Sequence, residues 1–401
     1  LQVKPIEQSV DLSPSFYDVN TDWVDSVLNS LSIDQRIAQL FMVMAYSNKG
    51  TVHQKEIENL VVNYHIGGLM FLQGGPIRQA RLTNHYQELA QVPLMIAQDA
   101  EWGLSMRIDS TLRFPWNMTL GAIQKSEWIY KMGLEIGRQC KELGVHINFA
   151  PVVDVNSNPR NPIINNRSFG EQKQRVSDLG VAYMHGLQDM GVMACAKHFP
   201  GHGDTDMDSH KTLPIIRHSK EYIDSIDLVP YKNMIKSGLG GVMVAHLSIP
   251  SLDDKKNLAS SLSSNIVSGL LKKQLGFKGL VFTDGLNMAG VSQFYEPGDV
   301  DLKALLAGND VLLCAEDVPV AIEKIKLAID EKQITKKEID ERCRKILLAK
   351  KWFGLDEIVQ ISEENLIERL TTSETELLNR KLVEKSITLL QNDEQILPIR
   401  R

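Results

Sequence analysis

Short, mostly apolar runs alternate along the chain with longer amphipathic stretches. Each run has four or five residues and little regular exchange of polar and apolar positions, which is typical of strands buried on both faces of a parallel sheet. Such a series predicts an α/β protein rather than an all-helical or all-strand one. Eight runs follow this pattern: Phe41–Ala45, Gly68–Leu72, Pro93–Ala97, Val145–Phe149, Val192–Ala196, Gly241–Ala245, Leu280–Thr283 and Asp310–Cys314.

The stretches between these runs have helical periodicity, so that strands and helices alternate. Alternation predicts parallel strands joined by right-handed crossovers. A doubly wound sheet would show the same strands, but a count of eight favours a (β/α)8 TIM-like barrel. No Gly-x-Gly-x-x-Gly follows the first run, which removes the main support for a dinucleotide-binding sheet. Helices are expected at Ile77–Ala90, Ser126–Leu143, Gln172–Met190, Lys220–Ser237 and Ser261–Gln274.

Beyond the eighth run the pattern predicts the end of the barrel and a further segment. Helices are expected at Val318–Glu331 and Lys336–Trp352, then an acidic connector, a helix at Ser373–Lys385 and the apolar Ile387–Leu390. This last helix and strand resemble the opening of another α/β domain whose remainder is missing. The expected organisation is an N-terminal lead over 1–21, a catalytic barrel over 22–355, and a linker with a truncated second domain over 356–401.

Composition narrows the possible partners. The 44 Lys and Arg residues against 50 Asp and Glu leave a formal net charge of −6, without a basic stretch suited to phosphates, so nucleic acid is not an expected partner. No run reaches the roughly 18 apolar residues that a membrane helix requires. The four cysteines, which have apolar neighbours and no Cys-x-x-Cys pair, are expected to be buried thiols: Cys140, Cys195, Cys314 and Cys343.

The chain begins at Leu1 rather than Met, after which a polar, proline-containing lead precedes the first periodic segment. We therefore expect a protein whose export signal has been removed, with a periplasmic or extracellular location and the cytoplasm as the alternative.

Polar residues gather directly after the apolar runs, where the strands of a barrel end. In a TIM barrel this carboxyl-terminal rim carries the chemistry. The residues in such positions are Asp99, Asp154, His198, His246, Asp284 and Glu316.

The densest group of polar residues is the loop Lys197-His-Phe-Pro-Gly-His-Gly-Asp-Thr-Asp-Met-Asp-Ser-His210, with three histidines and three aspartates. One interpretation is a solvated loop whose aspartates form turns. A second is a zinc or manganese site with His198, His202, Asp206 and His210 as ligands. A third is an acid/base dyad in which Asp208 orients His210 and raises its basicity.

Asp284 ends the apolar strand in Gly279-Leu-Val-Phe-Thr-Asp-Gly285, where it either caps a following helix or faces the barrel mouth as a catalyst. Together with the histidine loop it supplies what double-displacement glycoside hydrolysis requires. One carboxylate attacks the anomeric carbon, and a second group first donates a proton and then removes one.

These residues resemble the bacterial β-N-acetylglucosaminidases of glycoside hydrolase family 3, whose hallmark loop reads Lys-His-Phe-Pro-Gly-His-Gly followed by Asp-Ser-His. The loop from Lys197 to His210 matches this motif, and the likeness extends from about Thr21 to Trp352. The resemblance implies that Asp284 is the nucleophile and that His210, partnered by Asp208, is the proton donor and acceptor. It also implies that the segment from Ser373 begins an α/β sandwich domain.

The resemblance further implies sugar-binding roles for several charged residues, because charged hydrogen bonds to hydroxyl groups orient a sugar ring. Many members carry Asp-Gln-Glu-Gly-Gly where this chain has Asp99-Ala-Glu-Trp-Gly103, so the pocket wall differs, and Trp102 is interpreted as a stacking contact. The substrate-binding residues expected in this way are Asp99, Trp102, Arg107, Arg167, Lys197 and His198, with His246 added from the rim.

The expected activity is therefore that of a retaining exo-β-N-acetylhexosaminidase that needs no cofactor or metal. Its substrate would be an N-acetylglucosamine-containing oligosaccharide or a peptidoglycan fragment. Four alternatives remain at this stage: a β-glucosidase or xylosidase, a glycoside phosphorylase, a metal-dependent hydrolase, and a non-catalytic glycan-binding barrel.

Overall fold

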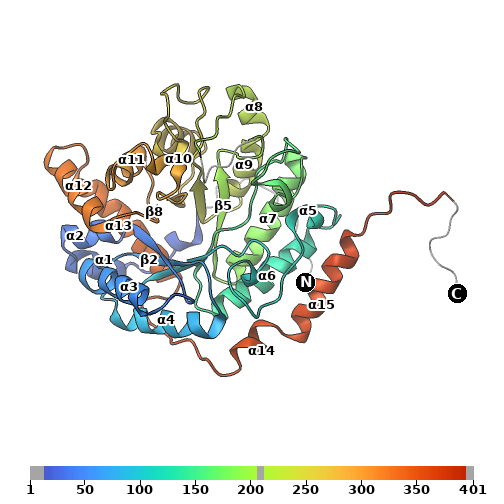
Figure 1. Ribbon diagram of the computed structural model, residues 1–401, viewed down its shortest axis with the longest axis horizontal. Coiled ribbons are helices and arrows are strands. Elements are labelled where there is room, and N and C mark those ends of the chain that lie inside the picture. Colours follow the sequence, from blue (N-terminus) through green and yellow to red (C-terminus); the bar gives the residue numbers. More distant parts are fainter. Residues whose placement is uncertain (1–12, 206–211, 394–401) are drawn as a thin grey trace.

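The computed structural model describes residues 13–205 and 212–393 and contains a nearly closed barrel of eight parallel strands with helices around it (Figure 1). The predicted TIM-like barrel is confirmed. The strands follow the spatial order β7-β6-β5-β4-β3-β2-β1-β8. Their bounds are β1 Phe41–Ala45, β2 Gly68–Phe71, β3 Met95–Gln98, β4 Ile147–Asn148, β5 Met193–Phe199, β6 Gly241–Val244, β7 Leu280–Thr283 and β8 Leu312–Leu313.

The helices lie outside the strands, and those between β1 and β8 connect successive strands (Figure 1). A π-helix, η5 Asn265–Gln274, stands where an α-helix from Ser261 was expected. The α-helices are α1 Asp22–Ser30, α2 Ile33–Ala38, α3 Thr51–Tyr64, α4 Pro76–Leu89, α5 Asn117–Leu120, α6 Glu127–Glu142, α7 Lys173–Asp189, α8 Lys220–Ser225, α9 Leu228–Lys236, α10 Ala289–Ser292, α11 Asp299–Ala307, α12 Val318–Asp330, α13 Lys336–Trp352, α14 Leu366–Leu370 and α15 Ser373–Ser386. Short 3-10 turns are η1 Ser15–Tyr17, η2 Leu104–Met106, η3 Asn165–Arg167 and η4 Ser260–Leu262.

The helix expected over Lys220–Ser237 is interrupted between α8 and α9. Pro230 lies in the first turn of α9 and has no N–H to donate to the carbonyl of Ile226. A single helix through this point would lose that hydrogen bond and meet the proline ring, so the chain breaks and begins a new helix.

The seam between β7 and β8 closes differently from the other strand pairs. It has one isolated bridge, between Phe282 and Val311, in place of a continuous ladder. Side chains supply the missing acceptors: the amide of Val281 donates to Asp310 Oδ2 at 2.9 Å, and the amide of Leu313 donates to Thr283 Oγ1 at 3.0 Å. The barrel is therefore closed in part by side-chain hydrogen bonds.

The interior of the barrel is packed with apolar side chains. Phe149 and Phe282 meet edge to face with ring centroids 5.4 Å apart, and both are fully buried. All four cysteines are buried with free thiols, as expected. This packing occupies the barrel axis, so space for a ligand is left at the ends of the strands.

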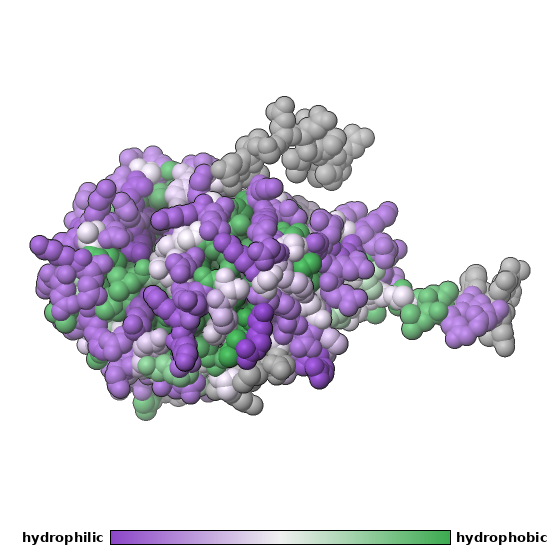
Figure 2. All heavy atoms as spheres, turned by 90° about the horizontal axis from the view of Figure 1, so that it is seen from above, coloured by the Kyte–Doolittle hydropathy of each residue, from purple (hydrophilic) through white to green (hydrophobic). Residues whose placement is uncertain are grey.

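The C-terminal segment packs on the outside of the barrel through α14 and α15. The backbone carbonyl of Arg369 accepts from Arg138 of α6 at 2.7 Å, and Thr375 Oγ1 donates to Glu135 Oε1 at 2.6 Å. The apolar run 387–390, expected to be a strand, pairs with no other segment in the described part of the chain. It extends away from the barrel with Leu390 92% exposed (Figures 1 and 2).

Within the residues that the structure describes, no helix has both the length and the apolar character needed to cross a bilayer.

Candidate active site

A cavity of about 310 Å³ lies at the carboxyl ends of the strands, where a TIM barrel carries its chemistry. One side is charged and the other is apolar. The charged and polar lining consists of Asp99, Arg107, Arg167, Lys197, His198, His202, Asp284 and Asn287, and the apolar lining includes Met44, Met70, Leu72, Met243, Met288, Leu313 and Cys314.

A larger cavity of about 690 Å³ lies at the other ends of the strands. It is lined by His146, which precedes β4, by Gly191, which precedes β5, and by the segment from Phe353 to Ser362. Because barrel enzymes place their reacting groups at the carboxyl ends, the smaller cavity is the candidate site.

The charged side begins with Asp99, which directly follows β3. Lys197, near the end of β5, donates from Nζ to Asp99 Oδ1 at 2.6 Å, and Arg107 pairs with the other oxygen of the same carboxylate. Lys197 is 2% exposed and Asp99 is 5% exposed, so this contact is nearly dry. The loop after β3 and strand β5, which are far apart in the sequence, are thereby tied together at the cavity.

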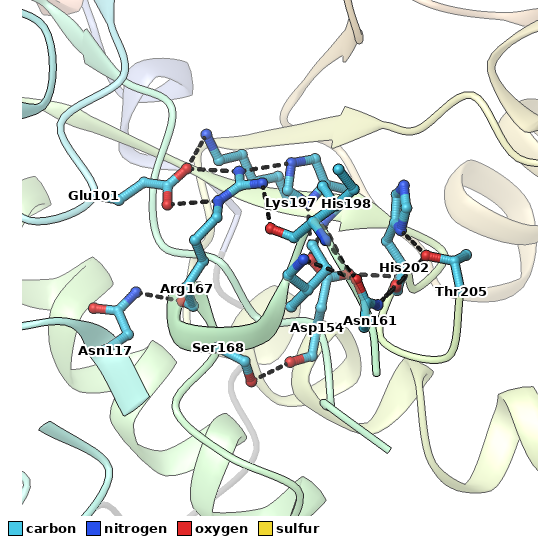
Figure 3. Close-up of polar contacts among 12 residues, drawn as sticks. Glu101, Asn117, Asp154, Asn161, Arg167, Ser168, Lys197, His198, His202 and Thr205 are labelled. Carbon is cyan, nitrogen blue, oxygen red and sulfur yellow. Dashed lines mark hydrogen bonds and ion pairs between the residues drawn. The ribbon is translucent and has the colours of Figure 1, made fainter. Parts of the chain in front are cut away.

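Glu101 extends the same cluster and is fully buried. It accepts from Arg167 twice, at 3.0 Å and 2.7 Å, and lies 2.8 Å from Lys197 Nζ (Figure 3). The paired contacts hold the planar guanidinium in a fixed orientation, which a single hydrogen bond would not do. Arg167 also approaches His198 Nε2 at 3.2 Å.

Asp154, which is buried in the segment after β4, connects His198 of β5 with His202 in the loop that follows β5. Its carboxylate contacts His198 Nδ1 at 2.7 Å and accepts from the backbone amide of His202 at 2.7 Å (Figure 3). If Nδ1 of His198 carries the proton, it donates to Asp154, and Nε2 is then free to accept a hydrogen bond from Arg167.

The acidic members of this cluster are held in their ionised form. Burial raises the pKa of Asp99, but the charges of Lys197 and Arg107 outweigh burial and hold that pKa well below its usual range. Burial acts in the same direction on Glu101, where Arg167 and Lys197 outweigh it and lower the pKa to about 2. The site therefore presents fixed carboxylates near neutral pH.

The basic members are stabilised reciprocally. Burial lowers the pKa of Lys197, but Asp99 and Glu101 outweigh burial and raise that pKa above its usual value. Asp99, Glu101 and Asp154 thus face Lys197, Arg107 and Arg167, so that three buried or half-buried anions balance three cations. Such a balanced array can donate to and accept from several hydroxyl groups at once.

Asp284 lies at the edge of the same cavity, directly after β7. Its backbone amide donates to the carbonyl of Val244 at 2.9 Å, and its Oδ1 accepts from the amide of Gly285 at 2.9 Å. His246 is buried behind it, with Nε2 2.9 Å from the carbonyl of Gly285 and Nδ1 2.7 Å from Ser261 Oγ. His246 therefore holds the backbone beside Asp284.

The structure brings together most of the residues predicted from the sequence. Asp99, Arg107, Arg167, Lys197, His198 and Asp284 all line the cavity. Two other predicted residues do not: Trp102 packs on Trp116 with ring centroids 4.3 Å apart, and His246 lies in the layer below. Asp208 and His210 lie outside the described residues.

Sequence reasoning assigned no role to Glu101, and it named Asp154 only as a rim residue. Glu101 stands two positions after Asp99 in a segment that leaves β3, and this spacing was the available signal. His202 was considered as a metal ligand alone. Its place in the cavity depends on the path of the loop after β5, which no local pattern indicates.

Among residues 13–205 and 212–393, no group of three or more His, Cys, Asp or Glu side chains is arranged to hold a metal ion. Two of the four ligands in the metal interpretation, Asp206 and His210, lie outside that part of the chain. The neighbours of His198 disfavour a cation, because Arg167 lies 3.2 Å from its ring and Lys197 precedes it.

A (β/α)8 barrel with acidic and basic side chains around a cavity at the carboxyl ends of its strands is an architecture that barrel glycosidases use. Residues 32–349 match the model described as the glycosyl hydrolase family 3 N terminal domain, and the chain belongs to that family.

The relatives that the chain matches are named for action on hexosamines. A beta-hexosaminidase A from Pseudoalteromonas piscicida is 38% identical over 290 residues, covering 67% of this chain and 48% of the relative. A beta-N-acetylglucosaminidase/beta-glucosidase from Cellulomonas fimi is 28% identical and covers 98% of this chain and 71% of the relative. The chain thus spans about half the length of the first and under three quarters of the second.

The fold is also that of solved family members. The structure of a glycoside hydrolase family 3 beta-N-acetylglucosaminidase from Paenibacillus sp. str. FPU-7 superposes with a TM-score of 0.83 at 35% sequence identity, covering 90% of this chain and 70% of that one.

Proposed function

We propose that this chain carries the catalytic site of a retaining exo-β-N-acetylglucosaminidase, which removes a terminal β-linked N-acetylglucosamine from an oligosaccharide or peptidoglycan fragment. The observation that supports the proposal most strongly is the position of Asp284 at the edge of the cavity that Asp99, Lys197 and Arg167 line. The family membership and the names of the relatives support the substrate class.

In this proposal the charged side of the cavity binds the hydroxyl groups of the terminal sugar. Lys197 and Arg107 donate to oxygen atoms, and the carboxylate of Asp99 accepts from hydroxyl protons while remaining ionised. These contacts fix the ring so that its anomeric carbon faces Asp284, which makes the attack effectively unimolecular.

Asp284 attacks the anomeric carbon, and the bond from that carbon to the leaving oxygen breaks. The leaving oxygen takes a proton from His210, and a covalent glycosyl-aspartate ester remains. Neutral His210 then removes a proton from water, whose oxygen attacks the same carbon and releases the sugar and Asp284. A histidine suits both steps because its ordinary pKa, about 6.5, lies near neutrality.

Replacement of the proposed nucleophile tests the mechanism. Asp284→Ala is expected to lower kcat on an aryl N-acetylglucosaminide by at least about four orders of magnitude, because the group that forms the covalent intermediate is lost. The melting temperature should change by only a few degrees, since Asp284 is at the cavity edge. Activity within about tenfold of the parent protein would contradict the assignment.

Mass spectrometry identifies the labelled residue directly. A fluorinated inactivator of the N-acetylglucosamine type should add one sugar mass to the intact protein and label the peptide that contains Asp284. A label on another peptide would transfer the nucleophile role to that residue. Repeating the turnover assay with added inorganic phosphate distinguishes hydrolysis from phosphorolysis, because a phosphorylase would release a sugar 1-phosphate.

Two other interpretations have their own outcomes. Loss of activity after exhaustive chelation, restored by zinc or manganese, would favour the metal-dependent hydrolase. Binding of N-acetylglucosamine without any turnover would favour a glycan-binding barrel.

A further inference from the structure

His202 is a buried histidine of the candidate cavity to which the mechanism above gives no task. Its side chain lines the cavity together with His198 and Asp284, and the residue is 1% exposed. Its Nε2 atom has no hydrogen-bond partner among the residues that the structure describes. A buried donor or acceptor without a partner costs about 1–3 kcal/mol, so such an atom in a residue that lines a cavity suggests that a bound ligand supplies the partner.

The ring of His202 is held in place from several sides. The backbone amide donates to Asp154 at 2.7 Å, the backbone carbonyl accepts from Asn161 Nδ2 at 2.7 Å, and Nδ1 lies 2.8 Å from Thr205 Oγ1 (Figure 3). Gly203 follows so close to Val155 that an added Cβ would lie 1.8 Å from its carbonyl oxygen. The orientation of the imidazole is therefore set before any ligand binds.

The same contacts indicate which ring nitrogen carries the proton. The Thr205 hydroxyl has one hydrogen, and its nearest acceptor is Nδ1 of His202 at 2.8 Å rather than the carbonyl of His202 at 3.3 Å. That carbonyl already accepts from Asn161. With Nδ1 as an acceptor, Nε2 carries the hydrogen and is a donor without an acceptor.

The ring is neutral under ordinary conditions. Burial, together with the neighbouring His198, lowers the pKa of His202 to about 4. A neutral imidazole does not attract a carboxylate as a cation would, and it suits a neutral acceptor such as an amide carbonyl.

The position of His202 indicates which part of a sugar it would meet. Asp284 lines the same cavity as His202, and Asp284 is the group proposed to attack the anomeric carbon. The substituent on C2 is attached to the neighbouring ring carbon and therefore lies on that side of the site. Apolar side chains of the same cavity, among them Met243 and Met288, offer contacts for a methyl group.

We propose that His202 donates from Nε2 to the acetamide carbonyl of the terminal sugar and so determines the preference for N-acetylglucosamine over glucose. This inference rests on the proposed function and adds a residue that selects the substrate. The relative from Cellulomonas fimi is named for both N-acetylglucosaminidase and glucosidase activity.

Two variants distinguish the contribution of Nε2 to binding from that of Nδ1. In His202→Gln the side-chain amide nitrogen reaches about as far as Nε2, whereas in His202→Asn it reaches only the position of Nδ1. We would titrate N-acetylglucosamine and glucose into the parent protein and both variants by calorimetry. We expect His202→Asn to weaken N-acetylglucosamine binding by at least about tenfold and glucose binding by less than about twofold. His202→Gln should stay within about threefold of the parent protein for both sugars.

The outcomes that would overturn the assignment differ from those that would overturn the function. Equal losses for both sugars in His202→Asn, no loss at all, or a His202→Gln variant as weak as His202→Asn would each remove the role of His202. If either variant fails to fold, Thr205→Val provides the second measurement, because it frees the ring and should weaken N-acetylglucosamine binding alone. A parent protein that binds neither sugar would instead contradict the proposed function.

Discussion

At the scale of single residues, the candidate site depends on buried carboxylates and buried cations that neutralise one another's charge. Glu101 is fully buried and would be costly to ionise alone, but Arg167 and Lys197 both contact it. Removing one partner of such a buried pair is far more harmful than its net contribution suggests, because the other charge is left without compensation. The residues proposed to bind the sugar are therefore coupled to Glu101, which is not among the residues that line the cavity.

Glu101→Gln tests this coupling. The substitution keeps the shape but leaves Arg167 and Lys197 without one counter-charge, so Arg167 should lose its fixed orientation. We expect kcat/KM on an aryl N-acetylglucosaminide to fall by about 100-fold, with a raised KM as part of the loss. Steady-state kinetics at pH 7 measures both constants.

Asp109→Asn is the matched control for Glu101→Gln, because Asp109 also pairs with an arginine, Arg78, but at an exposed position. Exposed pairs contribute at most about 1 kcal/mol, so this variant should keep the parent kinetics. An equal loss in both variants would mean that general destabilisation, rather than the position of Arg167, explains the result.

At the scale of secondary-structure elements, the weak point of the barrel is the seam between β7 and β8. Asp310 accepts from the amide of Val281 and from two buried or half-buried lysines, Lys272 at 2.8 Å and Lys345 at 2.7 Å. Lys345 also donates to the carbonyl of Gly279. One carboxylate thus joins the starts of both strands to α13 and η5.

Asp310→Asn is expected to lower the free energy of unfolding by about 3–5 kcal/mol at pH 7, since two lysines lose their shared counter-charge. Burial raises the pKa of Asp310, but Lys272 and Lys345 outweigh burial and hold that pKa well below its usual range. Its stabilising contribution is therefore present above about pH 4, the ordinary pKa of an aspartate, and is lost as the pH falls further.

Urea unfolding of the parent protein and of Asp310→Asn at pH 7 and near pH 3 would measure this effect. The difference between their stabilities should be large at pH 7 and should shrink at pH 3. Asp299→Asn, at a half-exposed pair with Lys324 that has a single lysine partner, is the control and should change stability less at either pH. A difference that does not depend on pH would contradict the role given to the ionised carboxylate.

At the scale of the whole molecule, a buried lysine joins the beginning of the barrel to its end. The lysine belongs to α13, and its partner Gln39 follows α2. Lys350 of α13 is fully buried, and its Nζ donates to Gln39 Oε1 at 2.6 Å. Gln39 in turn donates to the carbonyl of His65 at 2.7 Å. This chain of contacts connects the last barrel helix with the turns before β1 and β2, and it closes the end of the barrel opposite the candidate site.

Burial lowers the pKa of Lys350 to about 7, and this predicts a pH-dependent stability. Between pH 7 and pH 10 the unfolded chain keeps the proton and the folded chain does not, so folding becomes more favourable as the pH rises. Lys350→Met removes this titration. As the pH falls from 10 to 7, the stability of the variant relative to the parent protein should increase by about 1.4 kcal/mol per pH unit.

Urea unfolding of the two proteins at several pH values between 6 and 10 would measure this trend. The variant leaves Gln39 Oε1 without its donor, which lowers its stability equally at every pH and does not affect the slope. Parallel curves for the two proteins would show that Lys350 stays charged in the folded state.

Much of the fold could be predicted because strand and helix patterns are local. The strand β1 has the predicted bounds, and α13 matches the predicted Lys336–Trp352 in full. The break between α8 and α9 was not predicted, because it depends on Pro230, and a pattern of apolar and polar positions does not register the effect of a proline on the backbone. The predicted strand at 387–390 required a pairing partner, which the described part of the chain does not supply.

The candidate site was predictable to the extent that its residues follow strands directly. The sequence by itself determined which side chains stand at the rim, because parallel strands of a barrel bring their carboxyl ends to one mouth. Only the tertiary structure decided that Glu101 pairs with Arg167 and that His202 lines the cavity with a ring nitrogen that has no partner in the described part of the chain. Such pairings join residues far apart in the chain, and they depend on loop paths and on distances of a few ångströms that form only when the barrel closes.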